Sequence, residues 1–74
     1  MKITVKYFGV LAEKMNRSSD VVNIEEGTLL SEFLNRWENS FDVKFKVAVN
    51  HKFIEEKALE ENDEIAFLPP FSGG

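Results

Sequence analysis

The 74-residue sequence contains no cysteine. This absence excludes disulfide bonds, thiolate metal sites, iron–sulfur clusters and cysteine nucleophiles. It also fits a reducing compartment, so we expect a cytoplasmic protein. The single histidine, His51, lies in a predicted turn without a base partner, so the sequence offers no nucleophile–base pair. We therefore expect a chain that is not catalytic alone and that holds no metal and no permanent cofactor.

Long apolar runs are also missing. Residues 1–8 alternate apolar and polar side chains, unlike a signal peptide or a membrane span, so we expect a soluble chain without a membrane partner. The net charge is −4, and the 9 basic residues are scattered. Nucleic acid requires a basic footprint, so it is not an expected partner either. We interpret the acidic runs as a solvated surface in preference to a docking surface for a basic partner.

The alternation of apolar and polar residues predicts a first strand over residues 2–8. Ile3, Val5 and Tyr7 share its buried face, and Phe8 is an apolar exception on the outer face. The patterns farther along the chain predict a helical turn over 10–15 and strands over 20–24, 44–49, 52–54 and 64–68. Asn50 and His51 are predicted to form the turn of a tight hairpin before the strand at 52–54.

One main helix is predicted after Gly27. Thr28 is placed to cap it, and Leu30, Phe33, Leu34 and Trp37 follow the i, i+3, i+4, i+7 spacing of an apolar helix face. We expect this helix to end near residues 39–40. The resulting order is typical of an α+β protein with a β-grasp, or ubiquitin-like, fold: a mixed sheet of about five strands covered by one main helix, over residues 1–68.

The sequence ends in Pro69-Pro70-Phe71-Ser72-Gly73-Gly74, and we expect residues 69–74 to be a flexible tail. The two prolines stop the last strand, because neither can donate to a ladder. Two residues without side chains then present a free carboxylate at the end of a thin segment, which can enter a narrow tunnel in another protein. Adenylation would activate this carboxylate, and sulfur delivery would give a thiocarboxylate. A frayed terminus that ends in two glycines by chance is the alternative.

The whole chain resembles the small subunit of molybdopterin synthase and, more broadly, the bacterial sulfur carriers related to ubiquitin. The most specific segments are 5–8, 47–50, 62–65 and the tail with its preceding strand, 66–74. Asn62 stands where family members commonly have glycine, and asparagine also tolerates a left-handed backbone. The proline pair argues against the thiazole-forming carriers, which generally lack it.

This resemblance implies that an adenylating enzyme, like those that activate ubiquitin, uses ATP to join AMP to Gly74. The Gly74 thiocarboxylate would then donate sulfur to a pterin precursor in the active site of the large subunit. In this interpretation Phe71 helps to seat the tail, Gly73 is slender and flexible enough to be threaded, and Ser72 lies between them in the tail.

The same resemblance implies that Phe8, Phe53 and Leu68 contact the large subunit, in a heterotetramer of two small and two large subunits. Other possibilities stay open. The first alternative is a sulfur carrier for another pathway, such as thiazole formation or tRNA thiolation. The others are a ubiquitin-like protein modifier and a plain interaction module.

Overall fold

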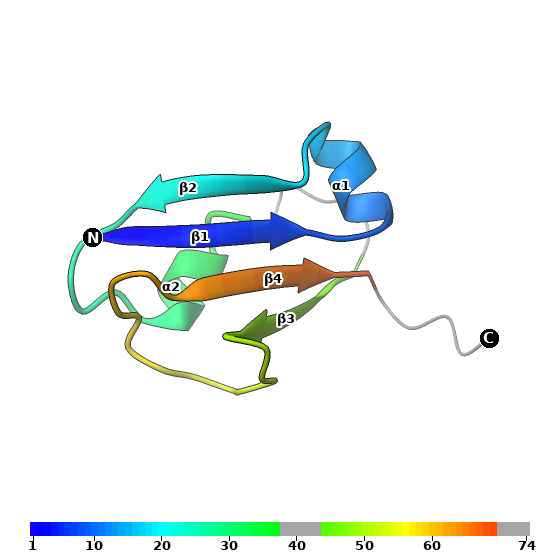
Figure 1. The fold of residues 1–74 in the computed structure, drawn as a ribbon. Coiled ribbons are helices and arrows are strands. Elements are labelled where there is room, and N and C mark those ends of the chain that lie inside the picture. Colours follow the sequence, from blue (N-terminus) through cyan, green and yellow to red (C-terminus); the bar gives the residue numbers. More distant parts are fainter. Residues whose placement is uncertain (38–43, 70–74) are drawn as a thin grey trace.

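The computed structural model describes residues 1–37 and 44–69. Figure 1 shows the elements that these residues form. In chain order they are β1 (Lys2–Tyr7), α1 (Val10–Met15), β2 (Ser19–Asn23), α2 (Leu30–Leu34), β3 (Lys46–Val49) and β4 (Glu64–Leu68). The predicted helical turn over residues 10–15 is confirmed as α1.

The four strands form one mixed sheet in the order β2-β1-β4-β3. The central pair, β1 and β4, is parallel, and each edge strand is antiparallel to its neighbour. In this register Val5 lies opposite Ile65, and Tyr7 lies opposite Phe67. Helix α2 covers one face of the sheet (Figure 1). The mixed sheet predicted from the sequence is therefore confirmed, and it joins the first strand of the chain to the last.

The core lies between the sheet and α2. Ile3 and Val5 are 0 % exposed and Tyr7 is 2 % exposed, as the two-residue period of the first strand predicts. Helix α2 contributes Leu30 and Phe33 from the other side. The buried cluster contains Ile3, Val5, Tyr7, Leu11, Ile24, Leu30, Phe33, Val49, Leu59, Ile65 and Phe67.

The prediction of a strand over residues 52–54 is wrong. Among the described residues, this segment contributes a single bridge, in which Val49 and Lys52 exchange hydrogen bonds of 2.8 and 3.0 Å. Asn50 and His51 form the predicted tight turn with φ of 50° and 71°, the signs that a two-residue hairpin of type I′ requires. Beyond Lys52 the chain leaves the sheet, because burial of Leu59 draws the following loop towards the start of α2.

The start of the main helix also differs from the prediction. Leu29, not Thr28, is the N-cap of α2, and the Glu32 side chain accepts a hydrogen bond from the Leu29 N–H at 2.9 Å. The Thr28 hydroxyl instead donates to the carbonyl of Glu25 at 2.6 Å. Helical geometry covers Leu30–Leu34, followed by a turn to Trp37. The predicted end near residues 39–40 lies outside the described residues.

Candidate functional site

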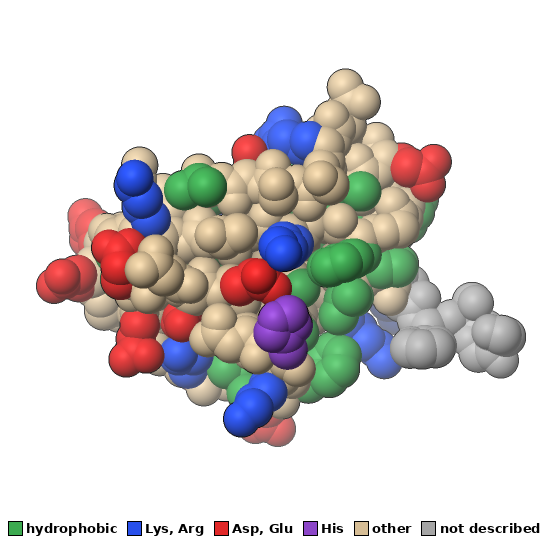
Figure 2. All heavy atoms as spheres, viewed as in Figure 1, with side chains coloured by type: hydrophobic (Ala, Val, Ile, Leu, Met, Phe, Trp, Pro, Cys, Tyr) green, Lys and Arg blue, Asp and Glu red, His purple; other side chains and the backbone are tan. Residues whose placement is uncertain are grey.

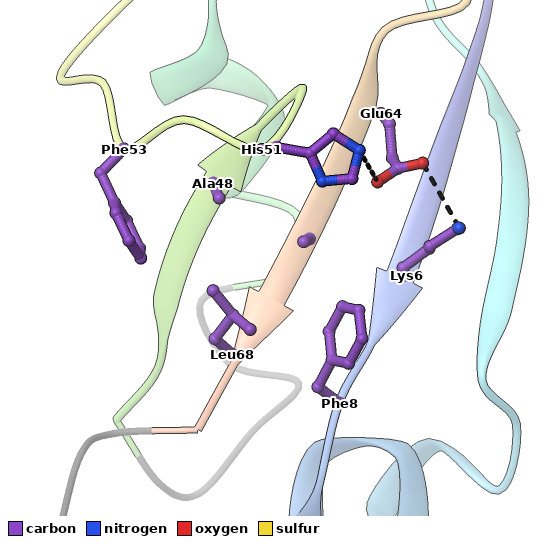
Figure 3. Close-up of a pocket in the computed structure, with 8 residues that line it drawn as sticks. Lys6, Phe8, Ala48, His51, Phe53, Glu64 and Leu68 are labelled. Carbon is purple, nitrogen blue, oxygen red and sulfur yellow. Dashed lines mark ion pairs between the residues drawn. The ribbon is translucent and has the colours of Figure 1, made fainter.

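The outer face of the sheet, opposite α2, carries an apolar hollow of about 270 Å³ (Figure 3). It is lined by Lys6, Phe8, Ala48, His51, Phe53, Glu64, Ala66 and Leu68. These side chains come from three strands and from the turn that follows β3. Figure 2 shows hydrophobic side chains gathered on this face, beside the histidine side chain.

Strand register builds the floor of the hollow. Ala66 of β4 lies opposite Lys6 of β1 on one side and opposite Ala48 of β3 on the other. Both alanines are buried, and their small side chains leave room above the sheet. Side chains two residues apart share a face of a strand, so Phe8 extends the outer row of β1, and Leu68 extends that of β4. The two alanines therefore form the floor of the hollow, and the larger side chains of Phe8, Phe53 and Leu68 surround it.

The three residues predicted to form a partner interface meet at this hollow. Phe8 is 44 % exposed and Phe53 is 69 % exposed, and Leu68 is half-buried between them in the view of Figure 3. The left-handed turn at Asn50 and His51 brings Phe53 across, although its segment is not a strand. An exposed group of large apolar side chains with a polar rim is typical of a protein-binding surface.

Polar and charged groups on one side of the hollow form its rim. The Glu64 carboxylate lies between the Lys6 ammonium, at 3.4 Å, and the His51 imidazole Nε2, at 3.7 Å (Figure 3). Exposed pairs of this kind add little to stability. Sequence reasoning missed Lys6, Glu64, Ala48 and Ala66, although the strand parity that places Phe8 and Leu68 on the outer face also places these four there.

A buried carboxylate supports the segment that carries Phe53. Asp63 is 6 % exposed and accepts hydrogen bonds from Asn50 Nδ2 at 2.9 Å, the Glu60 N–H at 2.8 Å and Lys57 Nζ at 3.0 Å. Burial by itself raises the pKa of Asp63, but these donors outweigh it and lower the pKa below its ordinary value. Asn50 Oδ1 in turn accepts from the Glu64 N–H at 3.0 Å, so Asp63 ties the turn to the sheet.

The last described residues of the chain, Leu68 and Pro69, lie beside the hollow, and we call this end of β4 the chain exit. Leu68 lines the hollow, and the next residue, Pro69, is the last that the structure describes. The predicted tail residues Phe71, Ser72, Gly73 and Gly74 lie outside the described residues, so their roles stay predictions.

The ThiS family model matches residues 5–74, which is nearly the whole chain. The chain belongs to the ThiS family. This membership makes it a small sulfur carrier related to ubiquitin, which agrees with the broader form of the sequence prediction. Family membership does not distinguish between the pathways that such carriers serve.

Solved structures with the same fold come from several organisms. SAMP1 from Haloferax volcanii is 22 % identical to this ThiS-family chain, with 100 % of each chain covered and a TM-score of 0.80. A putative molybdopterin converting factor, subunit 1, from Pyrococcus furiosus is 18 % identical over 95 % of this chain and 98 % of its own, with a TM-score of 0.82. These similarities establish the ubiquitin-like β-grasp fold, here with a four-stranded sheet and small helices.

A third similar structure is a protein–protein complex of subunits 1 and 2 of the molybdopterin-converting factor from Helicobacter pylori. The matched chain is 23 % identical to the ThiS-family chain described here, with 100 % of both covered and a TM-score of 0.67. The similarity concerns the fold.

Two further features of the ThiS-family chain bear on its chemistry. Within residues 1–37 and 44–69, no three His, Asp or Glu side chains gather as a metal site would require. No helix in the described part of the chain is long and apolar enough to cross a membrane.

Proposed function

We propose that this ThiS-family carrier is the sulfur-carrying small subunit of a molybdopterin synthase. The observation that supports the proposal is the position of the hollow beside the chain exit: Leu68 lines the hollow and directly precedes Pro69. A partner that covers Phe8, Phe53 and Leu68 therefore also receives the start of the tail. The Pro69-Pro70 pair, which thiazole-forming carriers generally lack, favours this pathway over theirs.

The proposed chemistry takes place at Gly74. A carboxylate oxygen of Gly74 attacks the α-phosphorus of ATP on an adenylating enzyme related to those that activate ubiquitin, and pyrophosphate leaves. A sulfur donor at the oxidation level of sulfide then attacks the acyl carbon, and AMP leaves, which gives the thiocarboxylate. In the large subunit the thiocarboxylate sulfur attacks a carbon of the pterin precursor that carries an oxygen substituent, the carbon–oxygen bond breaks and the oxygen leaves. Water then hydrolyses the acyl–sulfur bond. This step restores the Gly74 carboxylate and leaves the sulfur on the pterin.

In this proposal the chain supplies the carrier group and the docking surface, and the partners supply the catalytic bases and the ATP site. The hollow suits such a partner because burial of its apolar centre away from water is favourable, and its polar rim of Lys6, His51 and Glu64 fixes the orientation of the partner. The large subunit is the proposed occupant, in a heterotetramer of two small and two large subunits. The complex of subunits 1 and 2 from Helicobacter pylori supports this choice of partner.

Deletion of Gly74 tests the carrier role. The deleted chain should keep its fold and its binding to the large subunit, but it should form no thiocarboxylate and no molybdopterin. Intact-mass measurement should show that the native chain gains the mass of one sulfur in place of one oxygen. Gly73→Ala should hinder threading without affecting the fold. Molybdopterin formation by the Gly74-deleted chain would show that the proposed mechanism is wrong.

The docking surface is tested by Phe8→Ser, with Val21→Ser as its matched control. Val21 is 65 % exposed and lies on the same outer face, opposite Thr4, but outside the hollow. Loss of an apolar contact at the centre of an interface typically costs more than about 1 kcal/mol of binding, so Phe8→Ser should weaken binding to the large subunit by at least about fivefold. Val21→Ser should leave binding unchanged, and equal effects of the two variants would contradict the assignment of the surface.

A second candidate function is a ubiquitin-like protein modifier, in which activated Gly74 is joined to a lysine of a target protein. The similarity over the full length of both chains to SAMP1, a small archaeal modifier protein, favours keeping this candidate. Isopeptide-linked adducts in an extract of the native cells would support the modifier. A free chain that carries the extra sulfur, without such adducts, would support the carrier.

A further inference from the structure

The turn between β1 and α1 contains a glycine whose missing side chain makes room for the chain exit. Gly9 has φ of 56° and ψ of −133°, a combination that residues with a side chain adopt only under strain. A Cβ added to Gly9 would lie 3.1 Å from Cγ of Pro69, which is tighter than an ordinary van der Waals contact. Position 9 therefore favours glycine for two reasons: its backbone conformation and the close approach of Pro69.

Gly27 has the first of these two properties without the second. It also has positive φ, at 83°, but a Cβ added there would meet no heavy atom within 4 Å. An alanine at Gly27 is strained by its backbone alone, whereas an alanine at Gly9 is strained and also pushes against Pro69. The chain thus provides its own control for the steric part of the effect.

The Gly9 turn is fixed to the sheet on one side and to α1 on the other. The Phe8 N–H donates to the carbonyl of Phe67 at 3.1 Å, which holds the turn against the end of β4. The Gly9 carbonyl accepts from the Ala12 N–H at 3.1 Å, which holds it against the first turn of α1. A proline ring that rests on this turn has a defined position relative to the sheet.

The same contact connects the hollow to the chain exit. Phe8 and Leu68 line the hollow, and their next neighbours along the chain, Gly9 and Pro69, are the two residues that approach each other. Figure 3 shows Phe8 and Leu68 at the end of the sheet where β4 ends. A partner docked on the hollow therefore finds the chain exit at a fixed place beside it.

We propose that Gly9 is a positioning residue for Pro69, from which the tail that carries Gly74 starts. Because Gly9 has no Cβ, the Pro69 ring can pack against the β1–α1 turn. This packing fixes the position of Pro69 relative to the face on which the partner docks. The inference rests on the proposed function and deepens it, because it assigns to the body of the domain the position from which the tail that carries Gly74 starts. A Cβ at 3.1 Å requires the Pro69 ring to shift by a few tenths of an ångström. Misplacement of a reacting group by about 1 Å can cost on the order of 100-fold in rate, so this smaller shift at the chain exit should slow the reaction of Gly74 several-fold without preventing docking.

The test compares Gly9→Ala, Pro69→Ala, the double variant and Gly27→Ala, each first checked for folding by circular dichroism. An adenylating enzyme with ATP and a sulfide donor forms the thiocarboxylate, which is followed by intact mass, and affinity for the large subunit is measured separately. With the thiocarboxylated chains bound to the large subunit, Gly9→Ala and Pro69→Ala should each lower the kcat of sulfur transfer to the pterin precursor by about 3- to 10-fold while leaving affinity for the large subunit unchanged. Gly27→Ala should lower stability but not kcat.

Non-additivity identifies the contact itself. Because both substitutions disturb the same contact between Gly9 and Pro69, the double variant should lose no more of its kcat than the worse single variant. Multiplied effects in the double variant, or an unchanged kcat in Gly9→Ala, would overturn the inference. If Gly9→Ala does not fold, Pro69→Ala alone decides, since it leaves the Gly9 backbone untouched. A wild-type chain that is never adenylated would instead refute the proposed function, and the inference with it.

Discussion

Replacement of Asp63 by asparagine should destabilise the domain by removing a buried charge that three donors share. Asp63 is 6 % exposed, and its carboxylate accepts from Asn50, from the Glu60 N–H and from Lys57. The single carbonyl oxygen of an asparagine side chain accepts at most two hydrogen bonds, and its amide group would face donors. Leaving one buried group unsatisfied costs about 1 to 3 kcal/mol, so we expect Asp63→Asn to lower the free energy of unfolding by about 2 kcal/mol.

This loss is large for a chain of this size. Domains are stable by roughly 0.05 to 0.15 kcal/mol per residue, and a loss of 1 kcal/mol lowers the Tm of a small domain by about 4 to 8 °C. We therefore expect a Tm lower by about 10 °C. Urea unfolding followed by the fluorescence of Trp37, which packs against the core, measures the same free energy. Glu55→Gln removes the same charge at an exposed position and should change stability by less than about 0.5 kcal/mol.

The pH dependence makes the test sharper. Because the pKa of Asp63 is lowered in the folded state, the ionised carboxylate stabilises the fold above the ordinary value of 3.8, and this stabilisation is lost as the pH falls through the folded pKa. The advantage of the wild type over Asp63→Asn should be complete at neutral pH and should shrink progressively below about pH 3.8. A difference that stays constant across this range, or an Asp63→Asn variant as stable as the wild type at neutral pH, would refute the reasoning.

Three further variants test other parts of the domain. Tyr7→Phe should cost about 1 kcal/mol, because the Tyr7 hydroxyl donates to Asp20 at 3.0 Å. Burial, and next the bond to Asp20, raise the pKa of the Tyr7 phenol, so the wild type should lose stability as the pH rises above the ordinary value of 10.0, and Tyr7→Phe should lose less, as alkaline thermal melts can measure. Ile65→Val, at a position 0 % exposed, should lower the free energy of urea unfolding by about 1 kcal/mol. Val21→Ser, at an exposed position, should change the Tm by no more than the equivalent of about 0.5 kcal/mol.

Local periodicity predicted those elements whose side chains alternate between core and solvent. The first strand was predicted with the correct buried face, because an extended chain alternates its side chains whatever it packs against. The prediction failed at residues 52–54, where apolar and charged residues also suit a loop that crosses the edge of the sheet. Thr28 was predicted as the helix cap from its residue type, but its hydroxyl donates to the Glu25 carbonyl instead. Residue type alone does not decide between these two hydrogen bonds.

The candidate site combines both kinds of information. Strand parity placed Phe8 and Leu68 on the outer face, and the structure brings them together because β1 and β4, the two ends of the sequence, pair in parallel. Phe53 joins them only through the left-handed turn at Asn50 and His51 and the buried Asp63 that anchors it. The assignment of these residues to a partner surface is still a prediction, which the Phe8→Ser comparison will test.

The sequence by itself determined the faces of the strands, the α+β class, the lack of thiol chemistry and the chemical character of the segment that ends in Gly73 and Gly74. These properties depend on residue type and on spacing along a few neighbouring residues. Only the tertiary structure decided that a four-stranded sheet leaves an apolar hollow beside the chain exit, and that Gly9 makes room for Pro69 there. The physical reason is that such contacts join residues far apart in the chain, and their geometry depends on how all the elements pack at once.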